Sequence, residues 1–244
     1  MMKYVDNARV LGLGETMRFM ECCEGEKRMA DKLELFAKKH IDGHAPGIRG
    51  KEVQAYRLAG VENDHECSTA EEVLDKLRAG LHIYVREGSG AKNLETLIKT
   101  MLDAGVCLDR CAFCTDDKHV EEIRKEGHIS TCIRKAIALG VPVAKAYKMG
   151  SYQAAEFYGL KNYGAIGAGY RADIVFLDDL EQVRPLDVMK DGRILTEEDY
   201  AKDYSVPVPD ELLHTVHVGE VTKEKIRLSC DGKTDVIQMN HTRS

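Results

Sequence analysis

Two histidines and several carboxylates stand at equivalent places in this sequence, each at or just past the end of a short apolar run. They are Glu15, His44, His65, Glu87 and Asp116. Imidazole nitrogens and carboxylate oxygens are the groups with which proteins bind Zn²⁺, Mn²⁺ and Fe²⁺. If the fold brings these side chains together, they predict a divalent-metal site.

The elements that must position them alternate between short apolar runs and longer amphipathic stretches. The apolar runs predict strands at 8–15, 41–44, 60–66, 82–88 and 111–117, and helical spacing predicts helices at 26–39, 51–58, 68–80, 93–102, 129–139 and 143–158. Such alternation with short links indicates parallel strands, in either a doubly wound sheet or a barrel. Only a barrel brings the carboxyl ends of all its strands to one mouth, so the positions of the polar residues favour a barrel.

The alternation of short apolar runs and amphipathic stretches ends after Tyr158. Residues 164–173 are rich in glycine, and an apolar strand is predicted at 174–177. Short alternating segments at 213–218, 225–229 and 235–239 predict a small β-domain. We therefore expect a partial metallo-hydrolase (β/α) barrel over residues 1–160 and a second region, rich in β-structure, over 161–244.

Composition and charge exclude several classes of function. The 244 residues include 43% apolar and 31% charged residues, with a net charge of −6, so nucleic acid and anionic lipid are not expected partners. No apolar run approaches the roughly 20 residues of a membrane span. The first six residues lack the apolar segment of a signal peptide, which predicts a cytoplasmic protein.

Five motifs, in this order, resemble the adenine deaminases of the amidohydrolase superfamily. They are Leu11-Gly12-Leu13-Gly14-Glu15, Asp42-Gly43-His44-Ala45-Pro46-Gly47, Asn63-Asp64-His65-Glu66-Cys67, Arg86-Glu87-Gly88-Ser89 and Thr115-Asp116-Asp117. The resemblance implies an α/β fold: the second half of a (β/α)8 TIM-type barrel, with parallel strands four to eight. Part of a small β-sandwich or C-terminal β-domain would follow it.

The resemblance also implies a role for each residue. Glu15 would bridge two metal ions, and His44 and His65 would be metal ligands. Asp116 would bind metal and accept the proton of the attacking water. Glu66, next to His65, would be a second catalytic group, and the side chains expected to face the purine are those of Arg86, Glu87 and Ser89.

The implied reaction is the hydrolytic deamination of adenine to hypoxanthine and ammonia. A metal lowers the pKa of bound water to about 7, so that hydroxide can attack C6 of the ring. The expected cofactor is a binuclear Mn²⁺ centre, with Fe²⁺ or Zn²⁺ as alternatives because the ligand types suit all three. The expected partners are the small-molecule substrate and either a second copy of the chain or a complementing N-terminal fragment.

One departure from the family pattern keeps other interpretations open. The His-x-His pair of the superfamily's first barrel strand does not occur before Glu15, and His214-Thr215-Val216-His217 has the wrong spacing. The alternatives are another amidohydrolase, such as a cyclic amidase or a deacetylase, or an inactive or split-gene product that needs a partner chain. Cys107, Cys111 and Cys114 resemble a zinc motif only weakly, because no second ligand pair stands at a suitable spacing.

Overall fold

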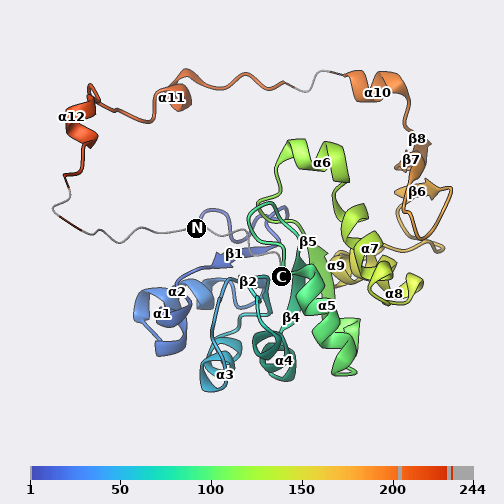
Figure 1. The fold of residues 1–244 in the computed structure, drawn as a ribbon, viewed down its shortest axis with the longest axis horizontal. Helices are drawn as coiled ribbons and strands as arrows, with labels where there is room; N and C mark the ends of the chain where they lie inside the picture. Colours follow the sequence, from blue (N-terminus) through green and yellow to red (C-terminus); the bar gives the residue numbers. More distant parts are fainter. Residues whose placement is uncertain (1, 203–204, 230–231, 233–244) are drawn as a thin grey trace. The chain divides into compact units, whose positions relative to one another are not determined.

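Parallel strands flanked by helices form the main part of the fold in the computed structural model, which describes residues 2–202, 205–229 and 232 (Figure 1). The chain divides into two compact units, with the boundary between Ile194 and Leu195. The larger unit contains all the motifs identified above. The predicted boundary at 160/161 stays a prediction, since the first unit also includes the strands that follow it.

The parallel strands follow the order of the chain. β1 (Gly12–Thr16) pairs with β2 (His40–Gly43), and β3 (Asn63–Asp64), β4 (His82–Arg86) and β5 (Cys111–Cys114) form a second parallel group. The amide of Glu62 donates to the carbonyl of Ile41 at 3.1 Å, which places β3 beside β2. The predicted parallel strands are therefore confirmed, and the fold is a mixed α/β structure consistent with part of a TIM barrel.

The close approach of β2 and β3 explains the glycine at position 43. A Cβ atom added there would overlap the carbonyl oxygen of Asn63. The amide of Gly43 also donates to the Oδ1 atom of Asn63 at 2.9 Å. Because His44 follows directly, this contact fixes the backbone from which a predicted metal ligand projects.

Helices connect the strands and cover their outer side, with α3, α4 and α5 lying along the same side of the strands in Figure 1. A capping box begins α4: the hydroxyl of Thr69 accepts from the amide of Glu72, and the Glu72 side chain accepts from that of Thr69. The short helices α1 and α6 were not predicted, since neither has a clear apolar stripe. The helices of the larger unit are α1 (Phe19–Glu24), α2 (Lys27–Leu35), α3 (Lys51–Leu58), α4 (Ala70–Arg78), α5 (Leu94–Asp103), α6 (Val120–Glu126), α7 (Ile129–Ala138), α8 (Val143–Gly150) and α9 (Tyr152–Phe157).

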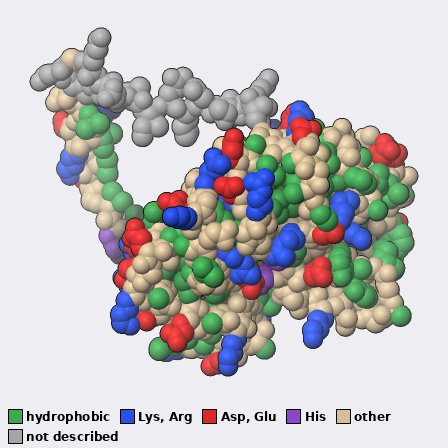
Figure 2. All heavy atoms as spheres, turned by 90° about the horizontal axis from the view of Figure 1, so that it is seen from below, with side chains coloured by type: hydrophobic (Ala, Val, Ile, Leu, Met, Phe, Trp, Pro, Cys, Tyr) green, Lys and Arg blue, Asp and Glu red, His purple; other side chains and the backbone are tan. Residues whose placement is uncertain are grey.

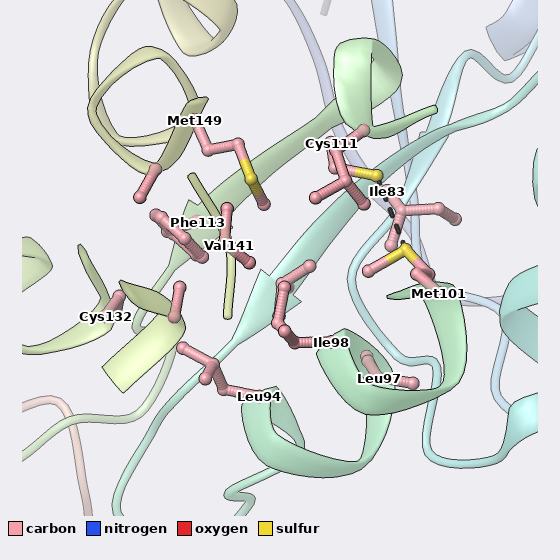
Figure 3. Close-up of a cluster of buried hydrophobic side chains, with 14 of the residues drawn as sticks. Ile83, Leu94, Leu97, Ile98, Met101, Cys111, Phe113, Cys132, Val141 and Met149 are labelled. Atoms are coloured by element: carbon pink, nitrogen blue, oxygen red, sulfur yellow. Dashed lines mark hydrogen bonds between the residues drawn. The ribbon is translucent and has the colours of Figure 1, made fainter. Parts of the chain in front are cut away.

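The largest apolar core lies between the outer face of β4 and β5 and the helices α5, α7 and α8 (Figure 3). Alternate residues of β4, such as Ile83 and Val85, point into it and are fully buried. The helix α5 contributes side chains at the spacing of one helical face, which are also fully buried: Leu94, Leu97, Ile98 and Met101. This packing holds β4 and β5 in place. Arg86 is the last residue of β4, and Asp116 lies just beyond the carboxyl end of β5.

The stretch predicted as one helix over 143–158 is two helices. The break lies at Ser151, whose φ of −145° and ψ of −80° are not helical. Gly164 crosses the chain here so closely that a Cβ atom on it would lie 2.7 Å from the Cα of Tyr152. The redirected helix α9 brings Phe157 onto the inner face of the strands, 5.9 Å from the ring of Tyr84. The amphipathic pattern could not reveal this break because it continues through both helices.

An antiparallel sheet ends the larger unit. It consists of β6 (Ile174–Leu177), β7 (Pro185–Lys190) and β8 (Arg193–Ile194), and β6 confirms the predicted strand at 174–177. The loop between β6 and β7 is held by the hydroxyl of Tyr147, which donates to the carbonyl of Leu180 at 2.8 Å.

The strands predicted at 213–218 and 225–229 are wrong in the described part of the chain. The second unit contains the short helices α10 (Glu197–Ala201), α11 (Asp210–Leu213) and α12 (Lys223–Ile226), and no strand within residues 205–229. The hydroxyl of Thr222 caps α12 by accepting from the amide of Lys225 at 3.4 Å. Alternating apolar residues form a strand only when another strand pairs with them, and the local cap favours a helix here. The predicted strand at 235–239 lies outside the described residues.

Acidic and basic side chains are interspersed on the face shown in Figure 2, so the charge of that face is not concentrated in one place. None of the helices in the described residues has the length and apolar character that crossing a membrane requires.

Candidate metal centre

The side chains predicted to bind metal lie at the carboxyl ends of neighbouring strands. Glu15 lies near the end of β1, His44 directly follows β2, His65 directly follows β3, and Asp116 lies two residues beyond β5. Since parallel strands bring their carboxyl ends to one edge, residues far apart in the sequence share one mouth.

Glu15, His44 and His65 form a first donor group, with ligand atoms within 4.8 Å of one another. The Nδ1 atom of His44 lies 3.5 Å from Oε2 of Glu15, and Nε2 of His65 lies 3.5 Å from Oε1 of Glu15. The two imidazole rings meet edge to face, with centroids 5.3 Å apart. The carboxylate therefore presents one oxygen to each histidine.

This first group fits a divalent cation. Two ligand atoms about 2.1 Å from a tetrahedral ion are about 3.4 Å apart, close to the 3.5 Å between Glu15 and each histidine. The Nδ1 atom of His44 is buried and has no hydrogen-bond partner among the described residues. Buried nitrogens are normally paired, so this atom is suited to coordinate an ion.

His65, Glu66 and Asp116 form a second donor group that shares His65 with the first. The Oε1 atom of Glu66 lies 3.5 Å from Nε2 of His65 and 3.7 Å from Nδ1 of His44. Asp116 has a φ of +45°, in the left-handed region that aspartate adopts more readily than most residues. Such backbone conformations cluster at functional sites.

Arg86 lies between the two carboxylates of the second group. Its Nη1 atom donates to Oε1 of Glu66 and, at 2.8 Å, to Oδ2 of Asp116. Its Nη2 atom donates to Oε2 of Glu66 at 3.2 Å. Burial disfavours the charged guanidinium, but the bonds to Asp116 and Glu66 outweigh it and raise the pKa of Arg86. The arginine is thus a fixed positive charge within the site.

A buried ion pair supports both loops that carry the histidines. Asp64 and Lys76 are fully buried, and the Nζ of Lys76 donates to Oδ2 of Asp64 at 2.9 Å and to the carbonyl of Ala45 at 2.7 Å. The other carboxylate oxygen, Oδ1 of Asp64, accepts from the amide of Ala45 at 2.7 Å, while Oδ2 accepts from that of Glu66 at 3.1 Å. Burial opposes the charge of Lys76, yet the attraction of Asp64 raises its pKa overall. The pair fixes the backbone beside His44 and His65 together.

Tyr56 of α3 connects His44 to the end of β1. Its hydroxyl accepts from the amide of His44 at 3.0 Å and donates to the carbonyl of Thr16 at 3.1 Å. The ring is fully buried, so Glu15 and His44 are held at a fixed separation.

Glu87 and Ser89, predicted to face the purine, make contacts outside the two donor groups. Glu87 is buried and pairs with the Nζ of Lys135 at 2.5 Å. The hydroxyl of Ser89 donates to the carboxylate of Glu122 at 2.8 Å. The carboxylate of Asp117 accepts from the amides of Ser89 and Gly90 at 3.1 and 2.8 Å, so the loop after β4 is fastened to the loop after β5.

Sequence reasoning missed the supporting roles of Asp64, Lys76 and Tyr56. One signal was available for Lys76. It lies three residues after Val73 on the same face of α4, and both are fully buried. A lysine on the apolar face of a helix needs a buried partner. The identity of that partner depends on the tertiary structure and could not be read from spacing.

The parallel α/β fold and the donor groups at the strand ends are typical of amidohydrolases, and the sequence comparisons agree. The amidohydrolase family matches residues 24–195, and the chain belongs to this family. Within it, the chain is similar to curated adenine deaminases. It is 40% identical to that of Desulfitobacterium hafniense over 97% of this chain and 42% of the relative, and 42% identical to that of Clostridium acetobutylicum over 95% and 41%. The chain thus spans about two fifths of the length of these relatives.

Solved structures share the fold at low sequence identity. The β-aspartyl dipeptidase of Fervidobacterium islandicum AW-1 aligns with a TM-score of 0.61 and 17% identity, over 84% of this chain and 63% of that structure. An amidohydrolase from Thermotoga maritima aligns with a TM-score of 0.51 and 16% identity, over 74% and 54%. These likenesses support an amidohydrolase-type α/β fold.

Proposed function

We propose that this chain carries the metal and substrate residues of an adenine aminohydrolase, which converts adenine and water to hypoxanthine and ammonia. The similarity to adenine deaminases, which extends over nearly the whole chain, is the observation that carries this proposal. The convergence of Glu15, His44 and His65 at one mouth supports it independently, since this chemistry needs an activated water.

The first donor group would hold a divalent cation, for which amidohydrolase membership is a further argument. A cation bound there would lower the pKa of water towards 7 and so provide the nucleophile at neutral pH. Mn²⁺ is the ion we favour, with Fe²⁺ and Zn²⁺ as alternatives. In the predicted binuclear centre, Glu15 would bridge this ion to a second one, to which Asp116 would also bind.

Asp116 would accept the proton of the attacking water and deliver it towards the ring or the departing amine. Its side chain is 32% exposed at the mouth and oriented by Arg86, which suits a proton acceptor that must meet substrate. Glu66, held by the same arginine, would be the second proton-transfer group. Arg86, Glu87 and Ser89 remain the proposed purine contacts. Glu87 bonds Lys135, and Ser89 bonds Glu122. These bonds hold the loop after β4, and purine would contact Glu87 and Ser89 at this loop.

The finer description of the fold is also a proposal. The parallel strands β1 to β5 would correspond to strands four to eight of a (β/α)8 barrel, and β6 to β8 to the return into a β-sandwich. A cytoplasmic location and self-association, or association with a complementing fragment, likewise remain predictions from the sequence.

The test is an assay of the purified chain for adenine-dependent ammonia release, after chelation and reloading with Mn²⁺. We expect turnover that depends on added metal and that Glu15→Gln abolishes, because this variant removes the carboxylate between the histidines. Turnover of a cyclic amide or an acetylated amine, but not of adenine, would assign the chain to another amidohydrolase activity. If the chain shows no turnover and binds no stoichiometric metal, the proposal is refuted, and a chain that needs a partner is favoured.

A further inference from the structure

The loop that follows β4, residues 87–93, is built around a carboxylate from another loop. The amides of Ser89 and Gly90, at the tip of the loop, donate to Oδ1 and Oδ2 of Asp117 at 3.1 and 2.8 Å. A Cβ atom on Gly88 would overlap Oδ1 of Asp117, and one on Gly90 would lie 2.6 Å from Oδ2. Neither glycine has a positive φ. The two glycines therefore make room for this carboxylate and do not serve an unusual backbone conformation.

Both ends of the same loop lie beside the candidate metal centre. Arg86 directly precedes the loop, and its guanidinium bonds Glu66 and Asp116. The amide of Asn93, where the loop ends, donates to the carbonyl of Arg86 at 3.1 Å. The carboxylate that holds the tip belongs to the residue after Asp116, so the contact at the tip sets the position of the loop relative to the proposed proton acceptor.

We propose that Asp117 is a positioning residue, whose carboxylate holds the loop of residues 87–93 beside Asp116. The loop then presents Glu87 and Ser89, the proposed purine contacts, to the substrate. Asp117 itself touches neither metal nor purine, so it lowers the KM for adenine and contributes little to kcat or to metal affinity. The identity of the substrate in this inference rests on the proposed function, whereas the contact between the two loops does not.

The hold by Asp117 is independent of what the Ser89 side chain does. The hydroxyl of Ser89 accepts from the amide of His119 at 2.9 Å and donates to the carboxylate of Glu122 at 2.8 Å. To contact a purine, this hydroxyl must give up one of these bonds. The bonds to Asp117 come from backbone amides and remain in place when the hydroxyl turns. Asp117 can therefore fix the loop tip both before and after substrate binds.

Loss of this hold would reduce the fraction of molecules whose loop is in the binding position. Hydrogen bonds to an ionised carboxylate are stronger than those between neutral groups. The tip also contains two glycines, whose backbone has the most conformational freedom to regain. The apparent affinity for a ligand falls in proportion to the competent fraction, so a loop that is in place about a tenth of the time raises KM about tenfold.

Asp117→Ala removes both acceptors and tests the proposal in the metal-loaded full chain. We expect the KM for adenine to rise about tenfold, with kcat changed by less than about threefold and the bound metal unchanged. Asp117→Asn keeps one acceptor oxygen and should give an intermediate KM. The matched control is Asp31→Ala, which removes an exposed carboxylate paired with Lys27 on α2 and should leave KM unchanged.

Gly90→Ala tests the same contact from the other side. Among the described residues, its methyl group would meet only the carboxylate of Asp117 within 4 Å, so the variant should raise KM as Asp117→Ala does. In the Asp117→Ala background the collision is absent, and Gly90→Ala should add less than about twofold. The control is Gly219→Ala, where an added Cβ atom meets no described residue within 4 Å. Effects of Asp117→Ala and Gly90→Ala that multiply in the double variant would overturn the proposal.

Amide hydrogen exchange separates this inference from the proposed function, because it needs no substrate. Asp117→Ala should speed exchange at the amides of Ser89 and Gly90 at least about tenfold, while the amide of Asn93, which bonds Arg86, should be unchanged. Unchanged exchange at the tip, or faster exchange with an unchanged KM, would overturn the positioning role. If the unmodified chain does not act on adenine but the variant shows the faster exchange, the proposed function fails and the hold on the loop stands.

Discussion

At the scale of single residues, the site consists of metal-donor side chains that face one another and of Arg86, whose positive charge lies between two of the carboxylates. Glu15 is shared between His44 and His65, whereas Glu66 and Asp116 are shared through Arg86. Asp116 is therefore outside the first donor group although it lies at the same mouth. This separation allows metal binding and proton transfer to be tested one at a time.

Asp116→Asn should leave the metal ion of the first donor group bound and lower kcat by about 10²–10⁴-fold, the usual contribution of a general acid or base. The amide has nearly the same shape but cannot accept the proton, and Glu15, His44 and His65 are unchanged. Metal analysis together with the rate of ammonia release measures both effects. An unaltered kcat would remove Asp116 from the proton transfer, and loss of all bound metal would show that Asp116 is a ligand on which the first donor group depends.

At the scale of elements, what could be predicted depended on whether the signal was local. The capping box of Thr69 and Glu72 and the strand ends at His44 and His65 were predictable because each is encoded within a few residues. The break at Ser151 depends on a chain crossing from Gly164, and the pairing of Arg86 depends on loops from three strands. Contacts between residues distant in sequence leave no periodic trace, so spacing alone could not reveal them.

The packing of β2 against β3 predicts a large effect of Gly43→Ala. The added methyl group overlaps the carbonyl of Asn63, so the strands must move apart, at a cost of about 1–3 kcal/mol of unfolding free energy. Gly14→Ala is the matched control, since a Cβ atom there meets nothing within 4 Å, and should change stability by about 0.5 kcal/mol or less. Denaturant unfolding of the two variants measures the difference. Equal stability would show that the strands are less closely packed than described.

At the scale of the whole molecule, all the metal donors belong to one folded unit, so metal binding and folding are linked. Two of them, His44 and His65, project from loops held by the buried Asp64–Lys76 pair. An ion that binds the folded chain and not the unfolded one stabilises it by mass action.

Removing metal should therefore lower the melting temperature. At a free ion concentration 100 times Kd the stabilisation is about 2.7 kcal/mol, which for a unit of this size corresponds to about 5–10 °C. Thermal unfolding with Mn²⁺ and with excess chelator measures the shift. Glu15→Gln should show little shift, because its first donor group is incomplete, and a shift as large as that of the unmodified chain would point to a different binding site.

The sharing of one aspartate between two loops has a consequence for protein engineering. Because Asp64 and Lys76 of α4 hold the two histidine loops jointly, the His44 and His65 motifs cannot be transplanted separately. A design that copied only the histidines and Glu15 onto another scaffold would lack the internal brace that sets their spacing. The smallest portable version of this site includes α4.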